Sequence, residues 1–138
     1  MVAFSRQSKG VLFLLTAVGC ALGGALRYLC MLGISRCLGD AFPWGTLCVN
    51  ALGSFLLGMV LGSGIAPSAD IAAVEQLHAF AAVGFCGGLT TFSTFSLQNL
   101  SLLSAGSRAK LLANILGSVV LCLLAATAGY TVMEGWAA

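Results

Sequence analysis

Residues 84–96, GFCGGLTTFSTFS, lie inside a long apolar stretch and decide how the chain folds. Two adjacent glycines and two adjacent threonines at bilayer depth predict an interruption in a membrane-spanning helix. Such non-helical backbone is tolerated in a membrane only where it is buried in protein or lines a water-filled cavity. The segment therefore predicts a broken helix beside a polar path.

The interruption would release backbone carbonyls and be followed by two aromatic rings. The carbonyls of Gly87 and Thr90 would be free to coordinate a small cation, as in other discontinuous membrane helices. Phe92 and Phe95 lie three residues apart, on one face of the half-helix that follows. The edges of aromatic rings carry partial positive charge and can contact an anion. A Phe pair at this spacing is usually core packing, but the neighbouring break and hydroxyls favour contact with an ion.

Composition extends this prediction to the whole chain. Of the 138 residues, 59% are hydrophobic and only 7% are charged, and the mean hydropathy is +1.05. A soluble domain has about 25% charged residues, and the net charge of +2 forms no basic stripe for nucleic acid. A membrane span needs about 20 largely apolar residues. The sequence predicts an all-α membrane protein with one transmembrane domain over residues 1–138 and spans at about 11–34, 43–62, 77–103 and 110–132.

The basic residues leave the orientation of the chain open. Arg6 and Lys9 precede the first apolar run, which is too long for a signal peptide and is followed by three more spans, so we expect it to be retained. The opposite side of the membrane would hold Arg36, Arg108 and Lys110. Because Lys and Arg are nearly balanced, the chain either inserts one way with a weak bias or inserts both ways and forms an antiparallel pair.

Small residues predict close contacts between helices. Gly19 and Gly23 lie about one turn apart in the first span, and Ser54, Gly58 and Gly62 have the same spacing in the second. Small residues at this spacing let helix backbones approach one another. The contacts would lie within one protomer or in a dimer, and a dimer is plausible because one small four-helix bundle has little interior for a pathway.

Polar residues recur inside two other spans. Thr46 and Asn50 are four residues apart in the second span, and Asn114, Ser118 and Cys122 follow at steps of four in the fourth. Polar side chains in a membrane are costly and indicate a function. The alternative is hydrogen bonding between helices, which contributes about 0.6 kcal/mol per contact.

The chain lacks groups that several other activities need. The acidic residues Asp40, Asp70, Glu75 and Glu134 fall at or near span ends, and the only histidine is His78. Proton-coupled transport generally uses a protonatable group inside the membrane. The six cysteines form no C-x-x-C pair of the kind that binds zinc, and no serine lies in a nucleophile motif. These observations favour passive conduction and argue against an enzyme.

Four motifs, in order along the chain, carry a resemblance to a known family. They are GGALRY (residues 23–28), PWGTLCVNALGSF (43–55), the segment 84–96 and NILGS (114–118). Together they resemble the small bacterial fluoride channels of the CrcB (Fluc) family over nearly the whole chain. The resemblance implies an antiparallel, dual-topology homodimer with two fluoride pathways, each formed by residues from both protomers.

The resemblance also implies roles for individual residues. The two phenylalanines would form an aromatic box along each pore, Asn50 would orient the rings and offer an amide donor, and Ser118 would begin a polar track on the fourth helix. The residues implied along the fluoride pathway are Phe92, Phe95, Asn50, Thr46, Thr94, Ser118 and Cys122.

A central ion and a vestibule complete the implied arrangement. Gly87 and Thr90 would give backbone carbonyls to one structural Na⁺ on the dimer axis. Arg27 would lie at the vestibule end of the first helix, where it attracts anions or serves structure. The chain departs from the family at Cys122, where a second serine is usual and a thiol is a weaker donor, and at Gln98, where a vestibule glutamate is frequent.

The implied function is a passive, fluoride-selective channel that releases cytoplasmic fluoride through the cell (inner) membrane. Neutral donors suit this small, strongly hydrated anion, because a fixed positive charge deep in the pore would bind it too tightly to leave. Two alternatives stay open. One is a small dual-topology proton-coupled exporter, which needs a buried carboxylate, and the other is a structural membrane protein in which Asn50 and Ser118 are dispensable for ion flux.

Overall fold

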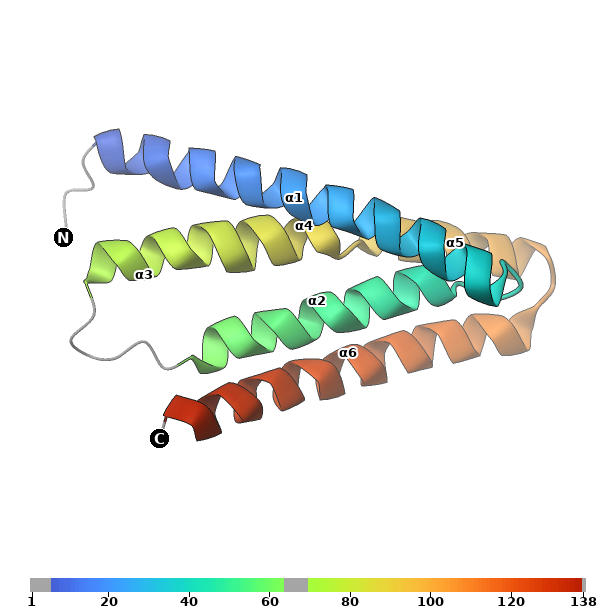
Figure 1. The fold of residues 1–138 in the computed structure, drawn as a ribbon. Coiled ribbons are helices and arrows are strands. Elements are labelled where there is room, and N and C mark those ends of the chain that lie inside the picture. The colour runs from blue at the N-terminus through green and yellow to red at the C-terminus, as the bar shows by residue number, and fades with distance from the viewer. Residues whose placement is uncertain (1–5, 64–69, 138) are drawn as a thin grey trace.

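The computed structural model describes residues 6–63 and 70–137, and all regular elements in these ranges are helices (Figure 1). Four of the described segments, at residues 9–38, 44–62, 71–104 and 108–136, are long and apolar enough to cross a membrane. The predicted all-helical membrane protein with four spans is thereby confirmed. The helices are α1 (Arg6–Leu38), α2 (Trp44–Gly62), α3 (Ile71–Leu77), the π-helix η1 (His78–Cys86), α4 (Gly87–Leu89), α5 (Phe92–Ser104) and α6 (Arg108–Ala137).

Three of the four spans extend further than the apolar residues alone predict, whereas the second, at residues 44–62, is within one residue of its predicted bounds. α1 has 33 residues and is about 50 Å long, whereas the hydrocarbon core is about 30 Å thick. The third span begins at Ile71 because Asp70 caps it, its side chain accepting a hydrogen bond of 3.1 Å from the Ala72 amide. These helices therefore continue beyond the predicted apolar runs into the polar residues that flank them.

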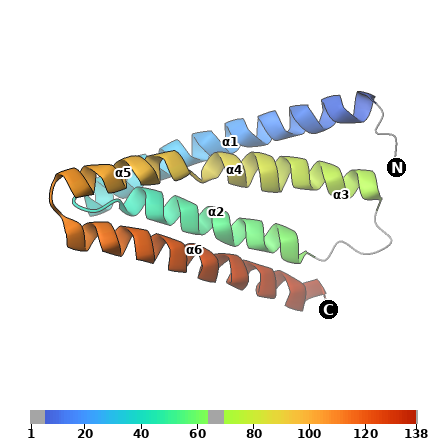
Figure 2. The same cartoon turned by 180° about the vertical axis from the view of Figure 1, so that it is seen from behind.

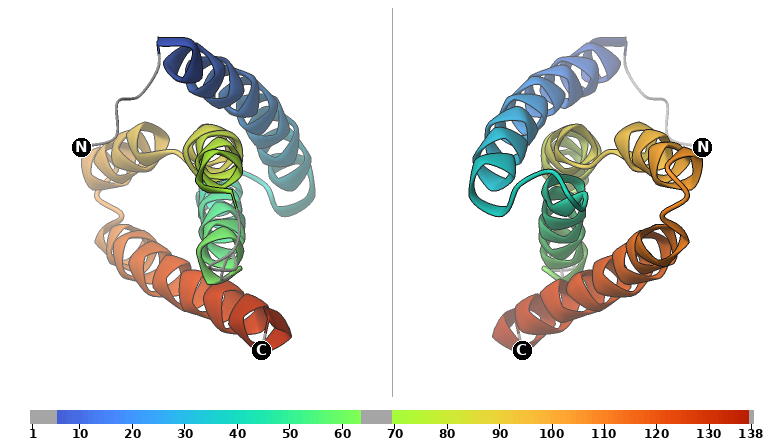
Figure 3. Two further views of the ribbon diagram at one scale, coloured as in Figure 1. Left: turned by 90° about the vertical axis from the view of Figure 1, so that its left-hand side faces the viewer. Right: turned by 90° about the vertical axis from the view of Figure 1, so that its right-hand side faces the viewer.

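The helices form two packed pairs rather than a closed bundle. α1 lies along η1 and α4, and α2 lies along α6. η1 and α2 occupy the centre, with α1 and α6 on opposite outer sides (Figures 2 and 3). Beyond α4 the chain leaves α1, and α5 lies beside α6 instead (Figure 3). One side of the molecule is therefore left open.

Glycines bring both pairs into backbone contact. A Cβ atom added at Gly23 of α1 would lie 2.8 Å from the amide nitrogen of Leu89, and one added at Gly88 of α4 would lie 2.9 Å from the Cα atom of Cys20. In the second pair, a Cβ at Gly58 of α2 would lie 3.0 Å from the Tyr130 nitrogen. The predicted close approach of helices therefore occurs within one protomer.

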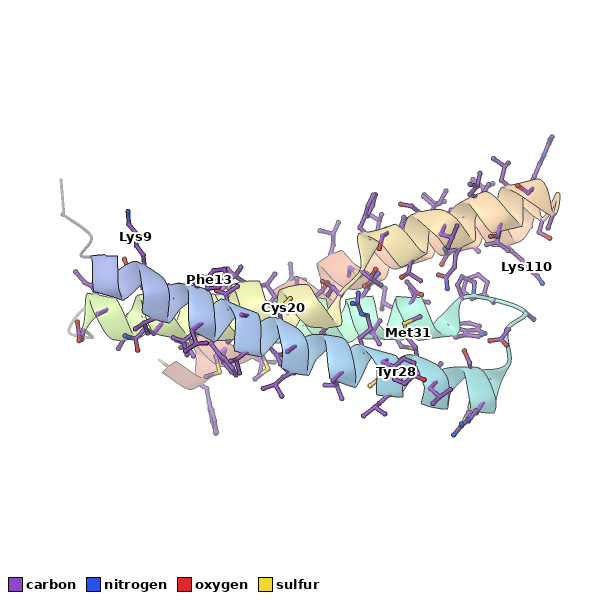
Figure 4. The ribbon with its side chains drawn as sticks, turned by 90° about the horizontal axis from the view of Figure 1, so that it is seen from above. Lys9, Phe13, Cys20, Tyr28, Met31 and Lys110 are labelled. Atoms are coloured by element: carbon purple, nitrogen blue, oxygen red, sulfur yellow. The ribbon has the colours of Figure 1, made fainter. Side chains whose placement is uncertain are left out.

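The outer faces are apolar. Large side chains such as Phe13, at 77% exposure, and Trp136, at 88%, have no cover from the rest of the described chain. Lys9 and Lys110 lie at opposite ends of the molecule (Figure 4). Lipid or a second protein chain would cover such an apolar surface between charged ends.

We predict that Gly23→Ala destabilises the fold by about 1–3 kcal/mol, because the added methyl group enters the backbone of the neighbouring helix. Gly33→Ala is the matched control, since a Cβ at Gly33 of the same helix meets nothing within 4 Å. Reversible unfolding in mixed detergent micelles measures the difference. Equal stability of the two variants would contradict the contact.

Candidate functional site

Two residues separate α4 from α5. Thr90 (φ −82°, ψ 159°) and Thr91 (φ −150°, ψ 121°) have extended backbones. The two preceding glycines, Gly87 and Gly88, remain helical. The change in direction at residues 90 and 91 moves α5 away from α1 and towards α6.

The extended residues lose helical hydrogen bonds, and other groups replace them. The Asn50 side chain pairs with Thr91 in both senses: its Oδ1 accepts from the Thr91 amide at 2.8 Å, and its Nδ2 donates to the Thr91 carbonyl at 3.1 Å. Arg27 Nη1 donates to the Thr90 carbonyl at 3.2 Å. The Thr90 amide donates to the Cys86 carbonyl at 3.0 Å. All four backbone polar groups of the two threonines are thus satisfied.

The start of α5 is capped by the side chain of Thr91. Its Oγ1 accepts from the Thr94 amide at 3.2 Å and donates to the Thr94 hydroxyl at 3.1 Å. This is the usual way in which a threonine satisfies one free amide at a helix N-terminus. Thr94, implied by the resemblance to lie on the pathway, is engaged in this cap and lines neither of the two cavities described below.

An open groove of about 390 Å³ lies beside the break, between α2, η1, α5 and α6. The rings of Phe92 and Phe95 are in its wall, with centroids 5.7 Å apart and planes tilted by 41°. Asn50, Ser118 and Cys122 line it from α2 and α6. The structure therefore brings together five of the seven predicted pathway residues, and the complete lining is Asn50, Gly53, Ser54, Leu57, Ala82, Cys86, Gly87, Thr90, Thr91, Phe92, Phe95, Ser118, Val119 and Cys122.

Thr46 and Gln98 lie in a second cavity, of about 190 Å³, near the end of α1. Asp40 and Trp44 are also in its wall. Thr46 is only 1% exposed, and its hydroxyl and the Gln98 Oε1 atom have no partner within the described part of the chain. Because buried polar atoms are almost always hydrogen-bonded, this cavity suits water or a polar ligand.

Arg27 lies beside the break. It was expected at the vestibule end of the first helix, but α1 continues to Leu38, and the guanidinium reaches the Thr90 carbonyl. A positive charge at this place is favourable, because the C-terminal end of the preceding helix carries partial negative charge. Arg27 therefore satisfies this carbonyl, while its role towards anions stays a prediction.

Asn99 is a polar contact behind the groove that the sequence reasoning missed, and it lines neither cavity. Asn114, 1% exposed on α6, donates from Nδ2 to Asn99 Oδ1 at 2.7 Å, and Ser118 Oγ lies 3.5 Å from Asn114 Oδ1. Asn114 therefore joins α6 to α5, while Ser118 reaches the groove. Asn99 follows Phe95 by four residues, a spacing that places both on one face of α5.

Four apolar spans, one of them interrupted beside a groove with neutral polar groups, define a multi-pass membrane protein. Residues 14–130 match the family described as CrcB-like protein, Camphor Resistance (CrcB). The chain belongs to this family.

Curated relatives support the assignment. A protein of Hahella chejuensis is 48% identical over 119 residues, covering 82% of this chain and 87% of the relative. Proteins of Magnetococcus marinus (44% identical, covering 84% and 92%) and Thermus thermophilus (46% identical, covering 86% and 90%) are similarly close. All three relatives are named fluoride-specific ion channel FluC.

We predict that Asn50→Ala loosens the break. The substitution leaves the amide and the carbonyl of Thr91 without their partner, and each unsatisfied group costs about 1–3 kcal/mol. Hydrogen–deuterium exchange at the Thr91 amide should accelerate by at least about tenfold, a factor that corresponds to about 1.4 kcal/mol. Ser54→Ala, on the same helix and in the same groove, is the control. The pairing would be refuted by an exchange rate that is the same in both variants.

Proposed function

We propose that this chain forms a passive, fluoride-selective channel, in the cell (inner) membrane, through which cytoplasmic fluoride leaves down its electrochemical gradient. Family membership and the names of the relatives support a channel rather than an enzyme. The observation that carries the proposal is the groove at the break: it offers amide, hydroxyl and aromatic groups, and no charged side chain among the described residues lines it.

The chemistry of the groove suits a small anion that must be dehydrated and then released. Ring edges of Phe92 and Phe95 and the Asn50 amide offer positive partial charge in place of water. The amides of Phe92 and Ser93 lie in the first turn of α5, where helix N-terminal N–H groups favour anions. Without a fixed positive charge in the groove, the ion would bind weakly enough to move on.

An antiparallel, dual-topology homodimer would enclose the pathway. The groove is open on one side, and Phe92, in its wall, is 79% exposed. A second copy laid against this side would cover the ring and supply the missing wall, while lipid covers the outer faces. Two equivalent grooves would give two pathways, and the near balance of Lys and Arg between the two ends is compatible with insertion in both directions.

The groups near residues 87 and 90 support a central Na⁺ as part of this proposal. The carbonyls of Gly87 and Thr90 are near the C-terminal end of a half-helix, where the dipole favours a cation. Gly87 is exposed and lines the open groove, so approach to this part of the chain is open. The Thr90 oxygen already accepts from Arg27, but a carbonyl has a second lone pair. The residues thus fit half of a Na⁺ site, and a second copy would supply the other half; the ion would hold the two breaks together.

The alternative, a small proton-coupled exporter, is not favoured. Such a mechanism needs a protonatable group in the membrane, and no Asp, Glu or His of the described residues lines the groove. A direct measurement of ion flux would distinguish a purely structural role from conduction.

We predict electrogenic fluoride efflux from liposomes that contain the purified protein, with no chloride efflux and no stoichiometric proton movement. A fluoride-selective electrode records the rate. Phe95→Ile should slow the flux by about fivefold, because it removes a ring edge that stabilises the ion by about 1 kcal/mol. Phe13→Ile, which changes an exposed ring of α1 outside the groove, should leave it unchanged.

Size-exclusion chromatography of each variant controls for assembly. Absence of fluoride flux in the wild-type protein would refute the proposed function. Unchanged flux in both Phe92→Ile and Phe95→Ile would instead remove the aromatic pair from the mechanism.

We predict that Na⁺ stabilises the assembled protein. A ligand that binds only the native state adds stability according to RT ln(1 + [L]/Kd), so the melting temperature in detergent should rise with Na⁺ concentration after preparation in N-methylglucamine. Potassium at the same ionic strength is the control. A melting temperature that is indifferent to the choice of cation would argue against the central site.

A further inference from the structure

Two of the six cysteines lie in the groove, on different walls. Cys86 ends η1 and is 4% exposed, whereas Cys122 belongs to α6 and is partly exposed. Both thiols are free, and both line the 390 Å³ groove. No other cysteine lines either of the two cavities described above. The groove thus offers two soft sulfur atoms in addition to its hard oxygen and nitrogen groups.

The surroundings of Cys122 favour reaction. Only the thiolate is a nucleophile and metal ligand, and a thiol in apolar surroundings is inert. Ser118 precedes Cys122 by four residues on the same helix face, and the Asn50 amide lies in the same groove. Cys20 and Cys48, by contrast, line neither cavity. Both are exposed, and exposed apolar side chains lie near them on the same helices. Polar neighbours and room for water distinguish the groove thiol from these.

We propose that the groove is an inhibitory site for soft, thiophilic metal cations, with Cys122 as their ligand, in the groove that Cys86 also lines. Soft cations prefer thiolate ligands, whereas fluoride is a hard anion and does not compete for sulfur. The predicted block of flux depends on the proposed channel function, because the groove must be the conducting path. Binding itself does not depend on it.

Methylmercury is the simplest probe, because it takes one thiolate. The S–H bond of Cys122 breaks and its proton goes to water, while the sulfur electron pair forms an S–Hg bond to CH₃HgCl and the Hg–Cl bond breaks to release chloride. Nothing is oxidised or reduced. The adduct carries no net charge, and it displaces water and ion from the groove beside Ser118 and Phe95.

The experiment treats reconstituted protein with CH₃HgCl and measures two quantities on the same sample: labelling of each cysteine peptide by mass spectrometry, and fluoride efflux. Wild-type efflux should fall by about tenfold when the donors along the path are covered, and an excess of dithiothreitol should restore it. Cys122→Ser should resist the block, whereas Cys86→Ser should be blocked like the wild type, because methylmercury takes only one thiolate. Cys37→Ser, at the exposed end of α1, should be blocked like the wild type.

The two readouts separate failure of this site from failure of the channel. If the Cys122 peptide stays unlabelled while Cys37 reacts, the site does not exist, whatever the flux. If Cys122 is labelled and efflux continues unchanged, the proposed inhibition is overturned. Wild-type liposomes without efflux before treatment would refute the channel, and labelling of Cys122 would still establish the binding site.

Discussion

The pairing of the Asn50 amide with both backbone groups of Thr91 is the interaction on which the site depends. A membrane offers no water to an interrupted helix, so each freed N–H and C=O group must find a partner in the protein. A carboxamide can donate and accept at once, as an adjacent peptide group would. Because Asn50 belongs to α2, the pairing also fixes the break against the α2–α6 pair.

Contacts with α1 and α2 hold the break from its other sides. Arg27 of α1 reaches the Thr90 carbonyl, and Gly53 of α2 lies so close to the Thr90 side chain that an added Cβ would overlap the Thr90 Cγ2 methyl group. Gly23 and Gly88 bring the backbones of α1 and α4 together just before the break. These contacts hold the turn at residues 90 and 91, and the groove lies beside it.

The sequence predicted the four helices because apolar runs of spanning length are a strong and local signal. Its interpretation of segment 84–96 was less accurate in detail: Gly87 and Gly88 stay helical, and Gly88 provides close approach to Cys20. The π-helical form of residues 78–86 left no recognisable pattern in the sequence, and a hydrogen bond from Thr16 Oγ1 to the Ala79 carbonyl ties it to α1.

Residues whose placement depends on distant contacts were the hardest to predict. Arg27 and Thr90 are 63 residues apart in the chain, so no local pattern announces their hydrogen bond. Thr46 and Asn50 share a helix face, as the spacing predicts, but they line different cavities because the facing surface changes along α2. Spacing gives the face of a helix, whereas the neighbour opposite each residue is set by tertiary packing.

Asn50 links the stability of the break to the chemistry proposed for the groove. Its NH₂ group has two hydrogens, and the donation to Thr91 uses one of them. The side chain also lines the groove, so the second hydrogen remains available there. Since the two hydrogens are fixed in one plane, the bond to the backbone also sets the direction of the free one. In the proposed channel, the Asn50 NH₂ group that donates to fluoride is thus held rigid by the hydrogen bonds between Asn50 and Thr91. The same hydrogen bonds make the interrupted helix possible.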